Sequence, residues 1–153
     1  MSKKINTYLL KNIFIIKKKN KLNFKFIQIS TDQIYNNSNN LKSTEKSKVY
    51  CFNEYSKQKY EAEKICTKNN AIILRCNFFC NYKGNLFNWV LKSASKKKVF
   101  YLFKDIYFNP LNIFTLCKYI EKVINLIDKK NITGIFNIGS HDIINKSNFC
   151  MHI

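Results

Sequence analysis

The sequence predicts an α/β protein with a parallel sheet, and three observations support this class. Apolar side chains recur at helical spacing over residues 5–20, and this segment ends in lysines that suit a helix C-terminus. Residues 71–76 (AIILRC) form a continuous apolar run, short enough for a buried parallel strand. Between them the predicted elements alternate as helix, strand, loop, helix and strand, which is the order of βα units in a parallel sheet.

Local patterns justify the elements of the first half. Residues 24–30 (FKFIQIS) are predicted to form a strand that ends in the polar triplet Ser-Thr-Asp. Residues 36–48 are rich in Asn and Ser and have no apolar pattern, which predicts a loop. A helix is predicted over residues 53–69, directly before the apolar run at 71–76.

The second half continues the alternation. It is predicted to contain, in order, an amphipathic helix at 85–96, a short strand at 99–103, a long amphipathic helix at 111–127 and a strand at 134–140. No internal repeat or linker interrupts the chain. Its length of 153 residues is that of one domain, or of part of a larger one.

The formal charge of +18 raises the question of a nucleic-acid partner. Almost all of the positive charge is lysine, and Arg75 is the only arginine, so the guanidinium fork that reads bases and phosphates is scarce. The abundant Lys, Asn, Ile, Phe and Tyr are encoded by A/T-rich codons, and such a base bias would account for the charge. We therefore expect no specific nucleic-acid partner.

Metal, disulfide and membrane classes are also disfavoured. The six cysteines form no C-x-x-C pair, and neither His141 nor His152 lies at ligand spacing from them, so we expect reduced thiols and no metal site. No apolar run approaches the ~18 residues that span a bilayer. The apolar segment near the start has no small-residue cleavage site. These patterns predict a cytoplasmic protein without a membrane partner.

Four polar residues are candidates for a catalytic site. Thr31 and Asp32 directly follow a predicted strand, and ligands of open α/β sheets bind beyond the carboxyl ends of strands. Tyr55 and Lys59 are four residues apart on a predicted helix, so they share one face. A neighbouring ammonium favours the phenolate, and we therefore expect Lys59 to lower the pKa of Tyr55 toward the range of general acid–base catalysis.

Five segments, in this order, resemble a known family: FIQISTDQIY, NEYSKQKYEAEK, AIILRCNFF, FKDIYFNPL and GIFNIGS. They look like the extended short-chain dehydrogenase/reductases, and most like dTDP-4-dehydrorhamnose reductase and related sugar-nucleotide reductases. The resemblance spans about residues 6–149. It implies the C-terminal part of a Rossmann-like parallel sheet plus a small α/β substrate lobe.

The resemblance implies a role for each residue of the group. Thr31, Tyr55 and Lys59 match the family's catalytic triad. Tyr55 would protonate the 4-keto oxygen of a nucleotide-linked sugar, and Thr31 would hydrogen-bond this oxygen. Lys59 would bind the nicotinamide ribose of NADPH or NADH together with Tyr55. Asp32 and Phe78 match positions that line the sugar pocket.

The sequence also departs from the family. The family begins with a strand and a glycine-rich turn that holds the cofactor pyrophosphate, whereas the three glycines here, Gly84, Gly134 and Gly139, all follow the triad. We therefore expect an N-terminally truncated member, with residues 1–80 as the C-terminal half of the cofactor domain and residues 81–153 as an incomplete substrate lobe.

Three alternatives remain open at this stage. The chain could be inactive alone and require a separately encoded N-terminal half. It could be a sugar-nucleotide epimerase or dehydratase of the same superfamily, which would share the tyrosine and the lysine. It could also be a non-catalytic sugar-nucleotide-binding or regulatory module, since the regulatory beta subunit of methionine adenosyltransferase resembles the same reductases.

Overall fold

The structure is a computed structural model of the 153-residue chain, and it describes residues 4–35, 42–80, 85–96, 99 and 101–152. These residues form α-helices and a mainly parallel sheet, as the sequence predicts. The chain divides into two compact units. The first contains the described parts of residues 1–36, 43–76 and 123–138, and the second contains those of residues 37–42, 77–122 and 139–153.

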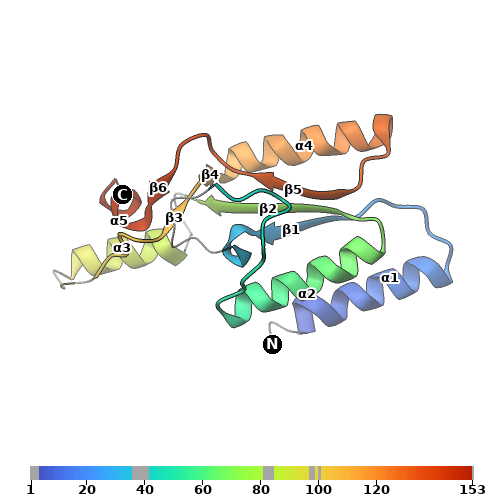
Figure 1. The fold of residues 1–153 in the computed structure, drawn as a ribbon, viewed down its shortest axis with the longest axis horizontal. Helices are drawn as coiled ribbons and strands as arrows, with labels where there is room; N and C mark the ends of the chain where they lie inside the picture. The colour runs from blue at the N-terminus through green and yellow to red at the C-terminus, as the bar shows by residue number, and fades with distance from the viewer. Residues whose placement is uncertain (1–3, 36–41, 81–84, 97–98, 100, 153) are drawn as a thin grey trace. The chain divides into compact units, whose positions relative to one another are not determined.

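The first unit is an α/β layer structure (Figure 1). Its elements are η1 (Lys4–Tyr8, a π-helical turn), α1 (Leu9–Lys19), β1 (Ile27–Thr31), η2 (Asp32–Ile34), α2 (Glu54–Lys68), the start of β2 (Ile72–Phe79), the end of α4 (Ile113–Lys130) and β5 (Gly134–Ile138). Helices α1 and α2 lie side by side along one face of the strands (Figure 1).

Strand β2 lies between β1 and β5 and pairs with both in parallel. In this register Ser30 of β1 lies beside Arg75 of β2, and Arg75 lies beside Asn137 of β5. Thr31, the last residue of β1, lies beside Cys76. The carboxyl ends of the strands therefore meet at one edge, where ligands of this fold class bind.

The core of this unit lies between the sheet and the two helices. It consists of Leu10 and Phe14 of α1, Ala62 and Cys66 of α2, and Ala71 and Ile73 at β2. Phe26 closes one side, with its ring edge-to-face against Phe14 at 5.2 Å between centroids. The apolar spacing of both helices is thus explained by one shared layer, which fixes how α2 lies on the sheet.

The second unit contains short strands and helices. Its elements are the end of β2, α3 (Asn85–Ser95), β3 (Tyr107–Phe108), β4 (Pro110–Asn112), the start of α4, β6 (Ile144–Asn145) and α5 (Lys146–Met151). Strand β4 pairs in parallel with residues 77–79 of β2, and β3 pairs antiparallel with β6. The ring of Phe149 packs edge-to-face against Phe79 at 5.1 Å and Phe108 at 5.3 Å.

Two differences from the sequence expectation concern strands. The strand predicted at 99–103 is wrong for the residues described there, since Val99 and residues 101–103 are not in a strand. Val99 and Tyr101 are each 90% exposed, so an apolar run here does not mark a buried strand. The strand predicted at 24–30 begins only at Ile27, and the predicted loop at 36–48 falls partly outside the described residues.

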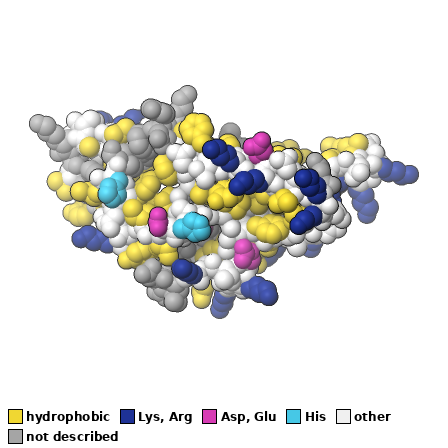
Figure 2. Space-filling view, turned by 90° about the horizontal axis from the view of Figure 1, so that it is seen from above, with side chains coloured by type: hydrophobic (Ala, Val, Ile, Leu, Met, Phe, Trp, Pro, Cys, Tyr) yellow, Lys and Arg dark blue, Asp and Glu magenta, His cyan; other side chains and the backbone are white. Residues whose placement is uncertain are grey.

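The surface is rich in lysine (Figure 2). On the face shown, lysine side chains lie dispersed among hydrophobic and uncharged ones, with few acidic groups (Figure 2). None of the helices that the described residues form combines the length and the apolar character needed to cross a bilayer. Within the same residues, no cluster of three or more His, Cys, Asp or Glu side chains is arranged to hold a metal ion.

Candidate active site

Helix α2 begins at a defined residue because of a capping box. The Asn53 side chain accepts a hydrogen bond from the Ser56 backbone N–H at 2.8 Å, and the Ser56 hydroxyl accepts one from the Asn53 N–H at 3.2 Å. This reciprocal pair satisfies two N–H groups that the first turn would otherwise leave without a partner. It fixes Asn53 as the N-cap, which places Tyr55 in the first turn of the helix.

Thr31 is held at the end of β1 by its own turn. Its side-chain oxygen accepts a hydrogen bond from the Gln33 N–H at 3.2 Å and so caps the short helix η2. The residue is buried, with 4% of its surface exposed. A hydroxyl that is fixed at the tip of a strand is a suitable partner for a reacting oxygen.

The structure brings the three predicted catalytic residues together. The Thr31 side chain lies close enough to the Tyr55 phenol to act on its pKa as a hydrogen-bond partner. The ammonium group of Lys59 lies 5.9 Å from the centroid of the Tyr55 ring and donates a hydrogen bond to the Ile29 carbonyl at 2.9 Å. Tyr55 remains 46% exposed, so its phenol is accessible to a molecule at this edge of the sheet.

The pKa of Tyr55 moves in the direction opposite to the expectation. Burial raises the pKa of the Tyr55 phenol, the hydrogen bond with Thr31 lowers it, and the nearby Cys76 and Asp32 raise it, with a net increase above the ordinary value. Lys59 was expected to lower this pKa, but its ammonium is engaged with the Ile29 carbonyl. The phenol therefore keeps its proton at neutral pH, as a proton donor requires.

The pKa of Lys59 is lowered, because partial burial disfavours the charged form. Cys76, Glu63 and Cys66 oppose this effect and raise the pKa. The site therefore places the protonated Tyr55 phenol near Lys59, whose pKa is set by burial against the charges of Cys76, Glu63 and Cys66.

We expect the Tyr55 phenol to titrate above the ordinary value of about 10. Because the folded state holds this proton more tightly than the unfolded chain, its contribution to stability is complete below pH about 10 and is lost as the pH rises through the folded-state pKa. Replacing Thr31 by Val removes the contact that lowers this pKa, so Tyr55 should then titrate at still higher pH.

The measurement is an NMR titration of protein labelled at tyrosine ¹³Cζ. The variant Tyr55→Phe assigns the signal, and Tyr60→Phe on the same helix is the matched control. A Tyr55 titration below the ordinary value would contradict the expectation.

The two predicted substrate residues differ in their placement. Asp32 is the first residue of η2 and lies close enough to Tyr55 to raise its pKa. Phe78 lies on β2 in the second unit, beside Leu111 of β4, and is 46% exposed. The substrate role of both residues stays a prediction.

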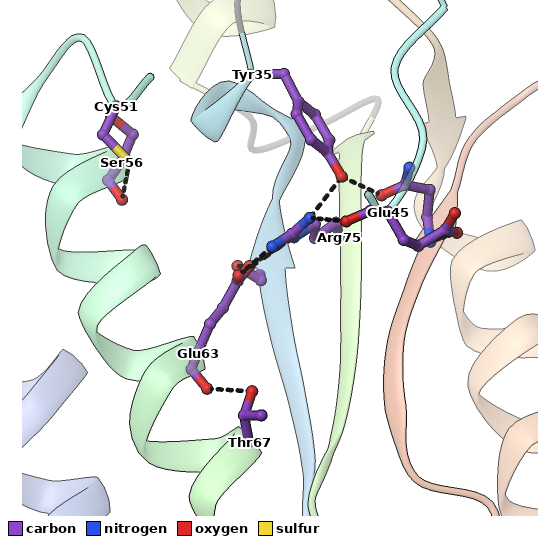
Figure 3. Close-up of polar contacts among 9 residues, drawn as sticks. Tyr35, Glu45, Cys51, Ser56, Glu63, Thr67 and Arg75 are labelled. Atoms are coloured by element: carbon purple, nitrogen blue, oxygen red, sulfur yellow. Dashed lines mark hydrogen bonds and ion pairs between the residues drawn. The ribbon is translucent and has the colours of Figure 1, made fainter. Parts of the chain in front are cut away.

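A buried ionic network joins α2 to β2 through Glu63 and Arg75 (Figure 3). The guanidinium of Arg75 donates to the Glu63 carboxylate from Nε at 3.0 Å and from Nη2 at 2.6 Å. The Ser30 hydroxyl donates to the same carboxylate. Glu63 is 1% exposed and Arg75 is 3% exposed. This ion pair is therefore formed away from solvent, with its hydrogen-bonding groups satisfied.

The Nη1 end of the Arg75 guanidinium is linked through Tyr35 to Asn137 of β5. Its Nη1 donates to the Tyr35 hydroxyl at 2.6 Å, and this hydroxyl donates to Asn137 Oδ1 at 3.0 Å (Figure 3). Asn137 in turn donates its backbone N–H to the Glu45 carboxylate at 2.7 Å. Burial would lower the pKa of Arg75, but the hydrogen bonds and charge of Glu63, together with the hydrogen bond to Tyr35, outweigh this effect and raise the pKa.

The sequence patterns described above did not predict this network. One signal was available, since the only arginine of a lysine-rich chain stands in the middle of an apolar strand. A charged residue in such a position requires a buried partner. Glu63, one helical turn beyond Lys59, was the acid at the right spacing.

The fold, and the place of Thr31, Tyr55 and Lys59 in it, indicate a class of protein. A parallel sheet with Thr31 at a strand end and the Tyr55–Lys59 pair on the following helix is the arrangement of a short-chain dehydrogenase/reductase. The chain belongs to the family of the RmlD substrate binding domain, whose model matches residues 2–153. No curated protein matches the sequence.

Solved structures with a similar fold include three of named function. A hypothetical dTDP-4-dehydrorhamnose reductase from Sulfolobus tokodaii is 22% identical, with a TM-score of 0.78, over 98% of this chain and 51% of its own. A dTDP-4-dehydrorhamnose reductase from Bacillus anthracis in complex with NADP is 17% identical, with a TM-score of 0.77, over 96% of this chain and 51% of its own.

The third is a dTDP-glucose 4,6-dehydratase from Bacillus anthracis in complex with NAD. It is 20% identical, with a TM-score of 0.75, over 95% of this chain and 50% of its own. At these identities the likeness shows the fold. The present chain spans about half the length of each of these proteins.

Proposed function

We propose that this chain is the proton-transfer and substrate-binding half of an NAD(P)H-dependent reductase of a nucleotide-linked 4-keto sugar. The observation that carries the proposal is the group at the end of β1. A neutral Tyr55 phenol lies close to Thr31, and Lys59 lies one helical turn further on. Membership of the RmlD substrate binding domain family supports the sugar-nucleotide substrate. Such a reaction belongs to the cytoplasmic synthesis of surface polysaccharides.

The residues divide the work of reduction. A bound nicotinamide would supply the hydride to the carbonyl carbon. Tyr55 donates its phenolic proton to the carbonyl oxygen, and Thr31 orients that oxygen. Lys59 binds the ribose hydroxyls and helps to return a proton to Tyr55. Asp32, which acts on Tyr55 from the same unit, would contact the sugar. The sugar contact of Phe78 rests on the family resemblance alone. Residues 1–80 would be the cofactor part and residues 81–153 the substrate lobe.

The chain's residues fit one end of the cofactor only. Tyr55 and Lys59 present a hydroxyl and an ammonium where a ribose needs hydrogen bonds. The pyrophosphate needs a turn of backbone N–H groups at a helix N-terminus, usually rich in glycine. No glycine precedes Gly84 in the sequence. The nicotinamide end therefore fits this chain, and the pyrophosphate end does not.

A complementary N-terminal half would provide the missing cradle. Strand β1 pairs only with β2 among the described strands, which leaves its other edge for a further strand. The outer side of α1 exposes Leu9, Ile15 and Ile16. These features, and the half-length coverage of the similar structures, support a partner segment that extends the sheet at β1.

For the isolated chain we expect NADPH binding weaker than about 1 mM, which is roughly −4 kcal/mol. Two or three hydrogen bonds of about 0.5–1.5 kcal/mol each must offset an association cost of at least ~4 kcal/mol. Calorimetric or fluorescence titration with NADPH measures this. Micromolar binding by the chain alone would contradict the missing cradle.

The function itself is tested with the N-terminal half supplied in trans. We expect the reconstituted protein to bind NADPH and to oxidise it in the presence of a dTDP-4-keto sugar, followed by absorbance at 340 nm. Restored binding without turnover would favour a non-catalytic binding module. Turnover that yields an epimer without net oxidation of the cofactor would favour the epimerase alternative.

A further inference from the structure

Three residues of α2 share one face toward the sheet. Tyr55, Lys59 and Glu63 follow one another at a spacing of four, so they lie one above the other. The first is half exposed at the mouth of the site, the second is hydrogen-bonded to the Ile29 carbonyl, and the third is buried. The α2 face that presents Tyr55 and Lys59 therefore ends at the buried carboxylate of Glu63.

That carboxylate is attached to the strands immediately behind the catalytic threonine. It accepts hydrogen bonds from Ser30 of β1 and from Arg75 of β2, which are partners in the parallel register. The next register pair is Thr31 and Cys76. A displacement of Glu63 on the sheet would therefore displace Tyr55 and Lys59 relative to Thr31.

The ion pair fixes the orientation of the Glu63 carboxylate, because Arg75 forms hydrogen bonds at both ends of its guanidinium. Its Nε and Nη2 bind one carboxylate in a fork, while Nη1 binds the Tyr35 hydroxyl and, at 3.4 Å, the Glu45 carbonyl (Figure 3). A planar guanidinium fixed at both ends defines the position and the angle of the carboxylate. A lysine at this position would supply the charge without the fork.

We propose that Glu63 and Arg75 are positioning residues that hold the Tyr55–Lys59 face of α2 in register with Thr31. This inference rests on one part of the proposed function, namely that Thr31, Tyr55 and Lys59 form the reactive site. The ammonium of Lys59 is faced by Tyr55, Glu63 and Cys66 from its own helix and by Cys76 from β2. Glu63 is the carboxylate of this set, and it favours the charged form of Lys59.

The test follows the two active-site side chains by NMR in the isolated chain. Tyrosine ¹³Cζ reports the hydrogen bond of Tyr55, and the variant T31V gives the signal that is expected when this bond is absent. Lysine ¹³Cε reports the titration of Lys59, assigned with K59R. The double variant E63Q/R75Q removes both buried charges together, and circular dichroism tests whether it is folded.

We expect the Tyr55 signal of E63Q/R75Q to move toward that of T31V, and Lys59 to titrate at lower pH than in the wild type, because Glu63 no longer favours its charged form. The matched control is E54Q, the same chemical change on the same helix at an exposed pair with Lys57, which should change neither signal. Wild-type signals from both residues in a folded E63Q/R75Q would overturn the proposal and leave the ion pair a stabilising contact.

The variant R75K keeps the test decisive if the double variant does not fold. It retains the balance of buried charge and removes the fork, so we expect Tyr55 to move in the same direction by a smaller amount. An unchanged Tyr55 signal in R75K would then reject the proposal. None of these measurements depends on enzyme activity. Unchanged NMR signals would therefore reject the positioning role without testing the reductase proposal. An inactive reconstituted protein would count against the reductase proposal without affecting the NMR result.

Discussion

Replacing Tyr55 by Phe in the reconstituted protein is expected to lower kcat by about 10²–10⁴-fold, the usual contribution of a positioned acid. This corresponds to about 3–5 kcal/mol of lost transition-state stabilisation. The substitution deletes one oxygen from a half-exposed side chain, so we expect the fold to be unchanged. The affinity for NADPH should change much less, because the phenol provides only one of the contacts to the ribose.

Steady-state kinetics with a dTDP-4-keto sugar would measure this effect. Tyr60→Phe, five residues along the same helix, is the control and should retain the wild-type kcat. A Tyr55→Phe variant with near-normal kcat would remove Tyr55 from the mechanism and favour a non-catalytic role for the chain.

Replacing Glu63 by Gln is expected to destabilise the chain by about 3–5 kcal/mol, because it leaves the buried Arg75 cation without its counter-charge. That is a large share of the roughly 5–15 kcal/mol that stabilises a typical domain. The double variant E63Q/R75Q should lose less than the single one, since neither buried charge remains. Breaking a buried pair costs more than replacing it.

Urea unfolding followed by circular dichroism gives these values. The control E54Q removes the exposed partner of Lys57 and should change stability by less than about 0.5 kcal/mol. A loss below about 1 kcal/mol for Glu63→Gln would mean that water or a rearranged side chain compensates Arg75 in solution.

Sequence patterns predicted the layers of this fold because they depend on local periodicity. The helices at 5–20 and 53–69 and the apolar strand at 71–76 each have a pattern that fits a single type of element, and each is present with boundaries shifted by a few residues. The strand predicted at 99–103 rested on hydrophobicity alone. Burial of such a run depends on tertiary partners that local sequence does not specify.

The site was predictable in part for a similar reason. Helical spacing places Tyr55 and Lys59 together, and the end of the strand places Thr31 near them. The sign of the Tyr55 pKa shift was not predictable, because it depends on how far the phenol is buried and on the Ile29 carbonyl that engages Lys59. The Arg75 network joins residues from six segments. The register of the strands aligns Ser30, Arg75 and Asn137, and the packing of α2 and two loops on the sheet adds the others.

The parallel register of β2 also has a consequence for folding kinetics. Its partners β1 and β5 come from distant parts of the sequence, so each pairing must close a long loop before any ladder forms. Helices α1 and α2 can form early from local contacts, whereas the central strand keeps at least one unpaired edge until both loops close. We expect the β-prone segment IILRC to be exposed during that interval, when the single charge of Arg75 would oppose pairing between chains. In the folded state this charge is paired with Glu63.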